Sequence, residues 1–323
     1  MISHINPSSS FQMYDIIGDV HGYASLLKKL LIQMGYSKTE NGYSHPTRKA
    51  IFVGDFVNRG PEIRKTIRLV RKMVENGSAL AIIGNHEINS IIYYLKDKDG
   101  SPLVRASQKN FLSVFKTINQ FSGRMDEWNS HRKWMGDLPL FLDLGDIRIV
   151  HACWSEEAIE TIRQAELEGK SRKSIFRNVY KKPKSKVSKS VIRLTKGIDF
   201  KMPHDLKIIS NKGISPRTFR MRWWENPAGK TFEGVSFESK FSLPDYLIPP
   251  KLLSATEIYP DDAPIVFFGH YCRGKGPHII KPNICCVDSC VTGTKTLTAY
   301  RWSGEKELVP GNLVQISSGK DRN

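Results

Sequence analysis

The sequence predicts an α/β fold with parallel strands, and two observations lead to this class. Short apolar runs rich in β-branched residues alternate with amphipathic helical stretches along the first part of the chain. The connectors between them, residues 47–50 and 76–79, are only a few residues long. Strand–helix–strand units of this kind imply parallel strands with helices packed on the faces of the sheet.

The first hundred residues supply these elements in order. Strands are expected at residues 13–17, 51–53 and 80–83. Between them, apolar residues recur at helical spacing in two stretches, which end at Gly35 and Gly77. We therefore expect a βαβαβ arrangement in this part of the chain.

The middle of the chain continues with helices and a hairpin. Residues 140–144 and 147–151 are expected to pair as a hairpin around a Gly-Asp turn. The segment 155–222 is charged and poor in clear strands, which favours a basic insertion or cap over the active edge of the sheet. Residues 100–137 are expected to be helical, with Phe111, Val114, Phe115 and Ile118 on one face.

The last part of the chain returns to β patterning after Gly269, with strands expected at 284–287 and 296–302. No internal repeat is visible, so we expect one catalytic domain rather than two. Its expected bounds are residues 13–310, with a flexible leader at 1–12 and a tail at 311–323.

Composition restricts the class of protein. The chain has 323 residues, of which 40% are apolar and 25% charged, as in soluble globular proteins. No stretch approaches the roughly 18 apolar residues that a membrane helix needs, and the N-terminus lacks the apolar region of a secretory signal. Five cysteines are an odd number for a disulfide framework. We therefore expect a cytoplasmic protein with reduced thiols and no membrane partner.

The net charge of +17 is concentrated in one run. Eleven Lys and Arg residues and no acid lie between Lys170 and Lys196. Such a run is typical of a solvated surface, and it can also attract anions. A possible anionic partner for this run, including nucleic acid, is therefore one hypothesis. On that hypothesis the protein is a nuclease or an end-processing phosphatase.

Polar clusters follow five of the expected strands, and their side chains are suited to a pair of metal ions. A bridging carboxylate, imidazoles and hard oxygen donors suit manganese, the expected metal, or iron, zinc or nickel. Asp19 and His21 can reach one ion, and Asp55 is the natural bridge. The second ion takes a neutral amide oxygen and two histidines. The six expected ligands are Asp19, His21, Asp55, Asn85, His151 and His270.

With these motifs in place, the chain resembles the calcineurin-like metallophosphoesterases, in the branch shared by phosphoprotein phosphatases and bacterial diadenosine tetraphosphatases. The resemblance extends from Tyr14 to Trp302 and implies two β-sheets packed face to face with flanking helices, a four-layer sandwich. The matching blocks are GDVHG (18–22), GDFVNRG (54–60), GNHE (84–87), VHACW around His151, FGHYCRG around His270, and the tail NICCVDSCVTGTKTLTAYRW.

The resemblance also implies roles for individual residues. Asp19, His21 and Asp55 would hold the first metal, and Asp55, Asn85, His151 and His270 the second. Arg59 would grip the substrate phosphate, and His86 would protonate the leaving oxygen. A second phosphate-binding arginine is expected just before Trp223. Arg217, Arg220 and Arg222 are the candidates, of which we favour Arg220 or Arg222.

The activity that follows is hydrolysis of phosphate esters or anhydrides, in which a metal-bridging hydroxide attacks phosphorus. A nucleotide or dinucleoside polyphosphate is the expected substrate, and a phosphorylated protein (Ser/Thr or Tyr) is the alternative. Most family members have Asp where this chain has Asn58. An amide can accept a hydrogen bond from His86 but supplies no negative charge, so the pKa of His86 should fall. We therefore expect a preference for good leaving groups such as phosphoanhydrides.

Overall fold

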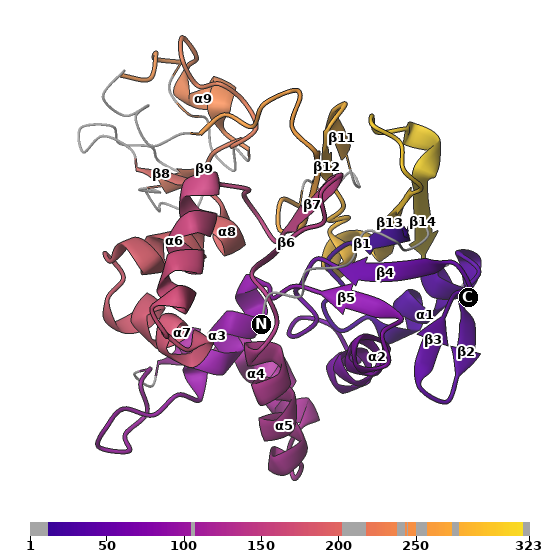
Figure 1. The fold of residues 1–323 in the computed structure, drawn as a ribbon. Helices are drawn as coiled ribbons and strands as arrows, with labels where there is room; N and C mark the ends of the chain where they lie inside the picture. Colours follow the sequence, from indigo (N-terminus) through magenta and orange to yellow (C-terminus); the bar gives the residue numbers. More distant parts are fainter. Residues whose placement is uncertain are drawn as a thin grey trace.

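Two five-stranded sheets form the centre of the fold, with helices on their outer sides (Figure 1). The protein is described here by a computed structural model. It covers residues 12–104, 107–201, 218–237, 243, 245–249, 257–272 and 278–318. The expected leader, apart from residue 12, and Arg217 lie outside the described residues.

The first sheet contains the expected βαβαβ unit. β1 (Met13–Ile17), β4 (Arg48–Phe52) and β5 (Ala79–Ala81) are parallel neighbours. The connecting helices are α1 (Ala24–Gln33) and α2 (Ile63–Glu75), and both are followed by a glycine in the left-handed region, as expected. On the other side of β1 the sheet is completed by β13 (Thr296–Trp302) and β14 (Leu313–Ser317), both antiparallel to their neighbours.

The second sheet is built around three parallel strands, β7 (Ile147–Val150), β10 (Ile265–Phe268) and β12 (Ile284–Cys286). The hairpin expected at 140–151 is confirmed, because β6 (Phe141–Asp143) is antiparallel to β7. β11 (His278–Lys281) forms the opposite edge. Two short ribbons lie outside the sheets, one of β2 (Ser37–Thr39) and β3 (Gly42–Ser44), the other of β8 (Asp199–Lys201) and β9 (Thr218–Arg220).

The two sheets pack face to face, which the alternation of their side chains makes clear. Ile16 of β1 and Phe267 of β10 belong to one core cluster that fills the space between the sheets. Their neighbours Ile17 and Phe268 point the other way and belong to the cluster shared with the helices. The expected sandwich fold is therefore confirmed.

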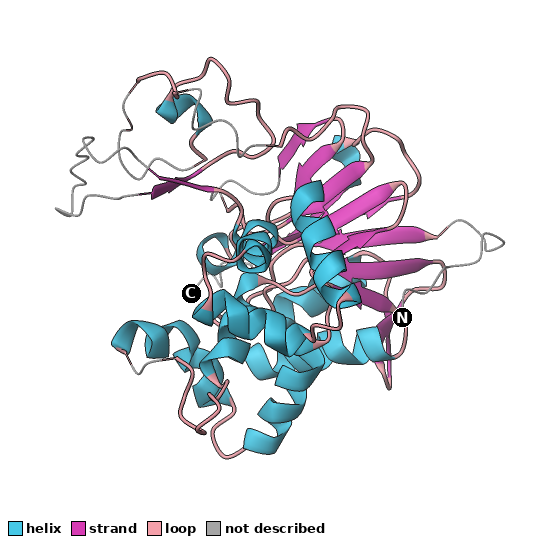
Figure 2. Cartoon of the chain, turned by 60° about the vertical axis from the view of Figure 1, so that its left-hand side comes forward, coloured by secondary structure: helices cyan, strands magenta, loops and turns pink. Residues whose placement is uncertain are grey.

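The helices that connect the two sheets along the chain form two groups (Figures 1 and 2). α3 (Asn85–Tyr93), α4 (Gln108–Gln120) and α5 (Met125–Gly136) follow the first sheet. The segment 155–222 contains α6 (Glu156–Leu167), α7 (Arg172–Lys181) and α8 (Lys186–Lys196), and α3 packs against α7 and α8. The short α9 (Phe232–Val235), α10 (Val291–Thr294) and a 3₁₀ turn (Pro310–Asn312) complete the elements of the described chain.

The expected apolar face of α4 is only partly a core face. Val114 is buried, but Phe111 and Phe115 are 41% and 43% exposed and contact each other, with ring centroids 5.2 Å apart. Helical spacing identifies side chains that share a face but does not say what covers that face. Among the described residues, no helix is long and apolar enough to cross a membrane.

Candidate metal centre

The polar clusters that follow the strands converge at one edge of the two sheets. Because β1, β4 and β5 are parallel, the loops after them leave the first sheet at the same edge, and β7 and β10 do the same in the second sheet. The six expected ligands are all contributed by these loops and by the first residue of α3. They are Asp19, His21, Asp55, Asn85, His151 and His270.

One group of donors forms around His21. Its Nε2 atom lies 3.5 Å from Asp55 Oδ2 and 4.0 Å from Asp19 Oδ2. Its Nδ1 atom lies 3.2 Å from the carbonyl oxygen of Val57, to which it can donate its proton. That bond leaves the Nε2 lone pair directed at the carboxylates, as a metal-binding imidazole requires.

A second group forms around His151. Its Nε2 atom lies 3.0 Å from Asn85 Oδ1 and 3.4 Å from Asp55 Oδ1, while Nδ1 is 2.7 Å from the carbonyl oxygen of Val53. The ring of His270 is 5.3 Å away, and its buried Nε2 has no hydrogen-bond partner among the described residues. The two oxygens of Asp55 thus face different groups, Oδ2 toward His21 and Oδ1 toward His151.

The electrostatics of the centre favour cations. Asp19 and Asp55 are almost completely buried, and Asp288 is buried beside them. Burial and the nearby Asp288 raise the pKa of Asp19 well above its usual value. Burial alone would lower the pKa of His151, but Asp55 outweighs it and raises the pKa to about 10. Buried carboxylates, imidazoles and an amide oxygen form a donor set that fits two divalent cations.

Backbone strain is concentrated at this edge. Seven non-glycine residues in the described part of the chain have positive φ, and five of them belong to the expected site. Such conformations cost free energy and persist where the surrounding structure enforces them, often at functional sites. The five are His21, Asp55, Asn58, Arg59 and His270.

Glycine is required at two positions where the chain passes against a carboxylate. A Cβ atom on Gly269 would lie 2.0 Å from Asp19 Oδ1, and one on Gly84 would lie 2.2 Å from Asp55 Oδ1. The loops of the two sheets can therefore approach the acids only with glycine here.

His86 lies next to the donor groups, and its surroundings differ from the expectation in one respect. Its Nε2 is 4.0 Å from Asp55 Oδ2 and 3.2 Å from Arg59 Nη2, and its Nδ1 is 3.0 Å from Asn58 Nδ2. The Thr117 hydroxyl accepts the backbone N–H of Asn58 and donates to Asn58 Oδ1 at 2.6 Å. The amide assigned from this network donates to His86, whereas the sequence led us to expect it to accept.

The reversed hydrogen bond has a chemical consequence. A Nδ1 atom that accepts a hydrogen bond from Asn58 carries no proton, so the ring is neutral and its proton is on Nε2. Because a guanidinium can only donate, the 3.2 Å approach of Arg59 Nη2 to Nε2 is then a contact and not a hydrogen bond. Burial lowers the pKa of His86, and the nearby Arg59 lowers it further. The pKa of His86 is therefore lowered, but burial and neighbouring cations are the causes. The effect expected from Asn58 itself remains a prediction.

Three polar residues of the centre were not given roles in the sequence analysis. The Glu87 carboxylate accepts the backbone N–H groups of residues 55, 56, 57 and 84 at 2.8–3.1 Å and so joins the loops after β4 and β5. Asp288 and Thr117 are the others. Two of them could have been found from the sequence, because Glu87 lies in the GNHE motif and Asp288 follows an apolar run that forms a buried strand. Thr117 is distant from every motif along the chain, so no sequence pattern points to it.

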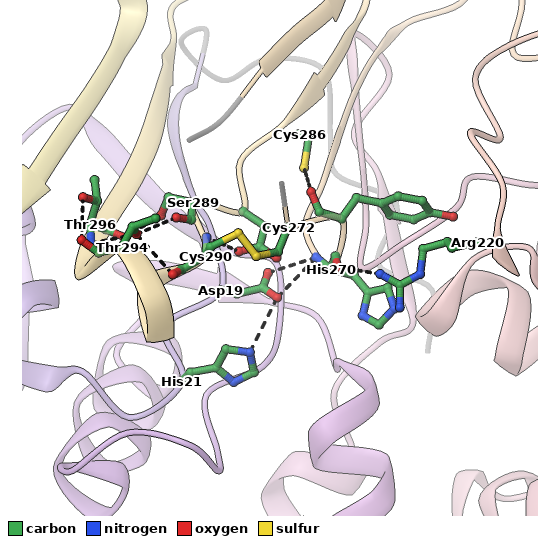
Figure 3. Close-up of a disulfide and its surroundings, with 12 residues drawn as sticks. Asp19, His21, Arg220, His270, Cys272, Cys286, Ser289, Cys290, Thr294 and Thr296 are labelled. Carbon is green, nitrogen blue, oxygen red and sulfur yellow. Dashed lines mark hydrogen bonds and ion pairs between the residues drawn. A yellow bond between two sulfur atoms is a disulfide. The ribbon is translucent and has the colours of Figure 1, made fainter. Parts of the chain in front are cut away.

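The two arginine candidates differ in position. Arg220 Nη1 lies 3.2 Å from the carbonyl oxygen of His270, and its guanidinium stacks on Tyr271 at 5.2 Å. Arg222 instead pairs with Glu225, 3.2 Å away. Of the two, only Arg220 adjoins the donor groups, as Figure 3 shows for Arg220 and His270.

A disulfide lies beside His270, and it corrects the expectation of reduced thiols. Cys272 is bonded to Cys290 (Figure 3). Cys153, Cys285 and Cys286 are free and buried. Phe268 and Cys286 are partners in the parallel pair β10–β12, so residues four positions further on remain side by side. Cysteine spacing along the chain does not reveal such a pairing across neighbouring strands.

The comparisons with known proteins agree with this geometry. A sequence model of calcineurin-like phosphoesterases matches residues 14–274. The chain therefore belongs to the calcineurin-like phosphoesterase family.

Similar curated proteins are bacterial. The chain is 41% identical over 83 residues to a bis(5'-nucleosyl)-tetraphosphatase PrpE [asymmetrical] of Halalkalibacterium halodurans, a match covering 25% of this chain and 33% of the relative. It is 45% identical over 73 residues to the protein of the same description from Oceanobacillus iheyensis, covering 22% and 29%. The chain thus spans about a third of the length of the curated relatives that it matches.

Among solved structures, a cold-active protein-tyrosine phosphatase of a psychrophilic Shewanella species matches with a TM-score of 0.50. The sequences are 13% identical, and the match covers 90% of this chain and 77% of that one. At this level of identity the likeness shows the fold alone.

Proposed function

We propose that the protein is a phosphoesterase that uses two divalent metal ions. One observation supports this most directly, namely that the two oxygens of the buried Asp55 carboxylate face separate donor groups around His21 and His151. In this proposal Asp19, His21 and Asp55 hold one cation, and Asp55, Asn85, His151 and His270 hold the other. Manganese is the metal we expect, with iron, zinc or nickel as alternatives.

The metals and the side chains have separate tasks in this proposal. A pair of divalent cations supplies a nucleophile derived from water near neutral pH and neutralises charge on the phosphoryl group. Arg59 is exposed and next to His86, so its guanidinium can bind two phosphate oxygens together. Arg220 is the second arginine we assign to phosphate binding, because Arg222 is paired with Glu225.

His86 is the group that adjoins the leaving oxygen in this proposal. A neutral imidazole with its proton on Nε2 can donate a hydrogen bond to that oxygen, but it is a much weaker acid than imidazolium. Expulsion of an alkoxide, as in hydrolysis of phosphoserine, needs a proton in the transition state. Expulsion of a phosphate from a phosphoanhydride needs it much less. The geometry around His86 therefore supports anhydride substrates.

Nucleotides and dinucleoside polyphosphates are the anhydrides we propose as substrates. The descriptions of the curated relatives name bis(5'-nucleosyl)-tetraphosphatase activity, which is consistent with this choice. For the protein-phosphatase alternative, the support is a likeness of fold only.

A comparison of the wild type with Asn58→Asp tests the proposal. A carboxylate beside Nδ1 would accept a hydrogen bond from a protonated Nδ1 and so raise the pKa of His86. Hydrolysis of alkyl phosphates should therefore gain most in rate. The measurement is kcat/KM of manganese-reconstituted protein for diadenosine tetraphosphate and for phosphoserine. We expect the wild type to have the higher kcat/KM for the anhydride. In the variant, the ratio of the two kcat/KM values, anhydride to phosphoserine, should fall about tenfold. An unchanged ratio would contradict the role of Asn58, and absence of turnover on every phosphorylated substrate would contradict the function itself.

We also propose that the basic run docks an anionic partner. The support is a cavity of about 900 Å³ between α3, α5 and α7, in which residues of the run meet cations from other elements. Burial lowers the pKa of Arg132 there, and its Nε has no hydrogen-bond partner in the described part of the chain. Two acids, Asp97 and Asp137, also line the cavity, and Asp97 is paired with Arg177. Cations are in excess, and they are Lys96, Arg132, Lys133, Arg172, Lys173 and Arg177.

Two double variants that remove the same charge, one inside the cavity and one outside it, distinguish binding at this cavity from a general effect of charge. We expect Arg132→Gln/Lys133→Gln to weaken binding of inorganic tripolyphosphate to metal-depleted protein about tenfold, as measured by calorimetry. The matched control is Lys182→Gln/Lys184→Gln, which removes the same charge from exposed positions of the run outside the cavity. Equal losses in both variants would reject the cavity as the docking site. A titration of nucleic-acid binding with salt would test the nuclease hypothesis, since phosphate contacts give a steep slope.

A further inference from the structure

A second cavity, of about 400 Å³, lies beside Arg59 and is not used by the metal centre. It is lined by the loops after β1 and β4, by α4, and by the residue that follows α10. The lining side chains that matter here are Tyr23, Arg59, Pro61, Phe115, Lys116 and Lys295.

Arg59 connects this cavity to the site of reaction. Arg59 lines the cavity, and its Nη2 atom lies 3.2 Å from His86 Nε2, which in turn is 4.0 Å from Asp55 Oδ2. In the proposed function His86 adjoins the leaving oxygen. The cavity therefore lies on the side of the centre from which the leaving group departs.

An exposed aromatic side chain faces this cavity. Phe115 of α4 is 43% exposed, although Val114 and Thr117 of the same helix are buried. Phe111 makes a contact with it but does not line the cavity. An exposed phenylalanine costs hydration free energy and offers a flat apolar face, which suits a planar ligand such as a nucleobase.

Hydrogen bonds fix two cations that also line the cavity. Lys116 Nζ donates to the carbonyl oxygen of Arg59 at 2.7 Å, and Lys295 Nζ donates to the Tyr23 hydroxyl at 2.7 Å. No carboxylate lines the cavity in the described part of the chain. Lys295 also has a positive φ of 56°, a strained conformation that is one of only two outside the expected site among the described residues. These positions favour a ligand that carries negative charge.

From these observations we propose that this cavity binds the nucleoside phosphate of the leaving group. Phe115 stacks on the nucleobase, while Arg59, Lys116 and Lys295 face the phosphates. The cavity volume is in the range of small-ligand sites and suits one nucleoside phosphate. This inference rests on the proposed function, since it assigns a place to one part of the proposed substrate.

Equilibrium binding tests the inference without turnover. Adenosine 5'-monophosphate and ribose 5-phosphate differ by the base, so the dissociation constant of ribose 5-phosphate divided by that of adenosine 5'-monophosphate measures what the base contributes. We expect Phe115→Ala to reduce this ratio about tenfold in manganese-reconstituted protein, measured by calorimetry. The matched control is Phe111→Ala, which removes an equally exposed ring from the same helix outside the cavity. Its ratio should equal that of the wild type.

A second variant protects the test against a loss of folding. Phe115→Trp keeps an aromatic face and should preserve the ratio, and thermal unfolding of each variant identifies any that are misfolded. The inference is overturned if Phe115→Ala leaves the ratio unchanged, if Phe111→Ala lowers it equally, or if the wild type binds both probes alike. Failure of the proposed function would appear differently, as absence of hydrolysis by a wild type that still distinguishes the two probes.

Discussion

The loops of the first sheet and those of the second hold their side chains at the metal centre by different means. In the first sheet, a single buried carboxylate, that of Glu87, accepts four backbone N–H groups and fixes the loops after β4 and β5 together. In the second sheet, the loop that carries His270 is tied to its neighbour by the Cys272–Cys290 disulfide. The backbone N–H of His270 also lies 3.2 Å from Asp19 Oδ2.

We call the loops of the first sheet the first half of the site and those of the second sheet the second half. The two halves are held in position by different kinds of contact. The first half relies on a polar network that forms between neighbouring loops and fails if its acceptor is lost. The second half relies on a covalent bond and on contacts across the sandwich, so it responds to redox conditions and to docking of the sheets. Asp55 belongs to both halves, because its two oxygens face different donor groups.

The largest effect is expected at this shared residue. Asp55→Asn removes a charge that faces both donor groups, so we expect kcat/KM to fall about 10⁴-fold, which is roughly 5.5 kcal/mol of transition-state stabilisation. Bound metal should fall below two ions per chain, measured by elemental analysis. Asp126→Asn, an exposed acid in the first turn of α5, is the control and should leave both quantities unchanged. Full metal occupancy in Asp55→Asn would argue against a bridging role.

Glu87→Gln should disrupt the first half. In the variant, an NH₂ group replaces one of the two carboxylate oxygens and cannot accept hydrogen bonds. The backbone N–H groups that now donate to that oxygen would lose their acceptor while remaining buried. We expect the free energy of unfolding in urea to fall by about 4 kcal/mol. For comparison, Glu75→Gln removes an exposed partner of Arg71 and should cost no more than about 0.5 kcal/mol. A loss of similar size in the two variants would refute the proposed network.

Cys272→Ser/Cys290→Ser should disrupt the second half. The bond closes a loop of 18 residues, for which the loss of chain entropy in the unfolded state corresponds to about 3 kcal/mol. His270 is itself an expected ligand in the second donor group, whereas the first group meets this loop only through contacts of Asp19 with the backbone. The affinity for the second metal should therefore fall more than the affinity for the first. Dithiothreitol should reproduce the effect in the wild type and have none in the double variant. Equal weakening of both metal sites would show that the halves are not independent.

The smallest effect concerns the two arginines. Arg220→Ala should raise KM for a phosphorylated substrate about tenfold, roughly 1.4 kcal/mol, because it removes a cation beside His270. Arg222→Ala breaks a pair with Glu225 and should leave KM unchanged. If Arg222→Ala has the larger effect on KM, the assignment of the phosphate-binding arginine is wrong.

Much of the fold could be predicted because its signals are local. Strand runs followed by glycine and a helix gave the parallel order of β1, β4 and β5, and the same pattern located the polar side chains at one edge. The resemblance to a known family supplied the second sheet and its packing on the first. Neither of these steps required knowledge of distant contacts.

The features that the sequence did not predict depend on contacts between distant segments. Cys272 and Cys290 are brought together by strand pairing, and Thr117 reaches Asn58 from 59 residues away. The orientation of the Asn58 amide follows from that hydroxyl and not from the amide itself. The exposure of Phe115 likewise depends on which element covers α4, and helical periodicity carries no information about that.

The contact between Asp19 and His270 spans 251 residues, and this has a consequence for how the protein matures in a cell. During translation the first donor group leaves the ribosome long before the residues that complete the second, since chains emerge at roughly 5–20 residues per second. A nascent chain therefore offers an incomplete binding site for roughly 12–50 seconds. If the protein binds two ions as proposed, the second ion can bind only after the chain is complete and the two sheets have packed together.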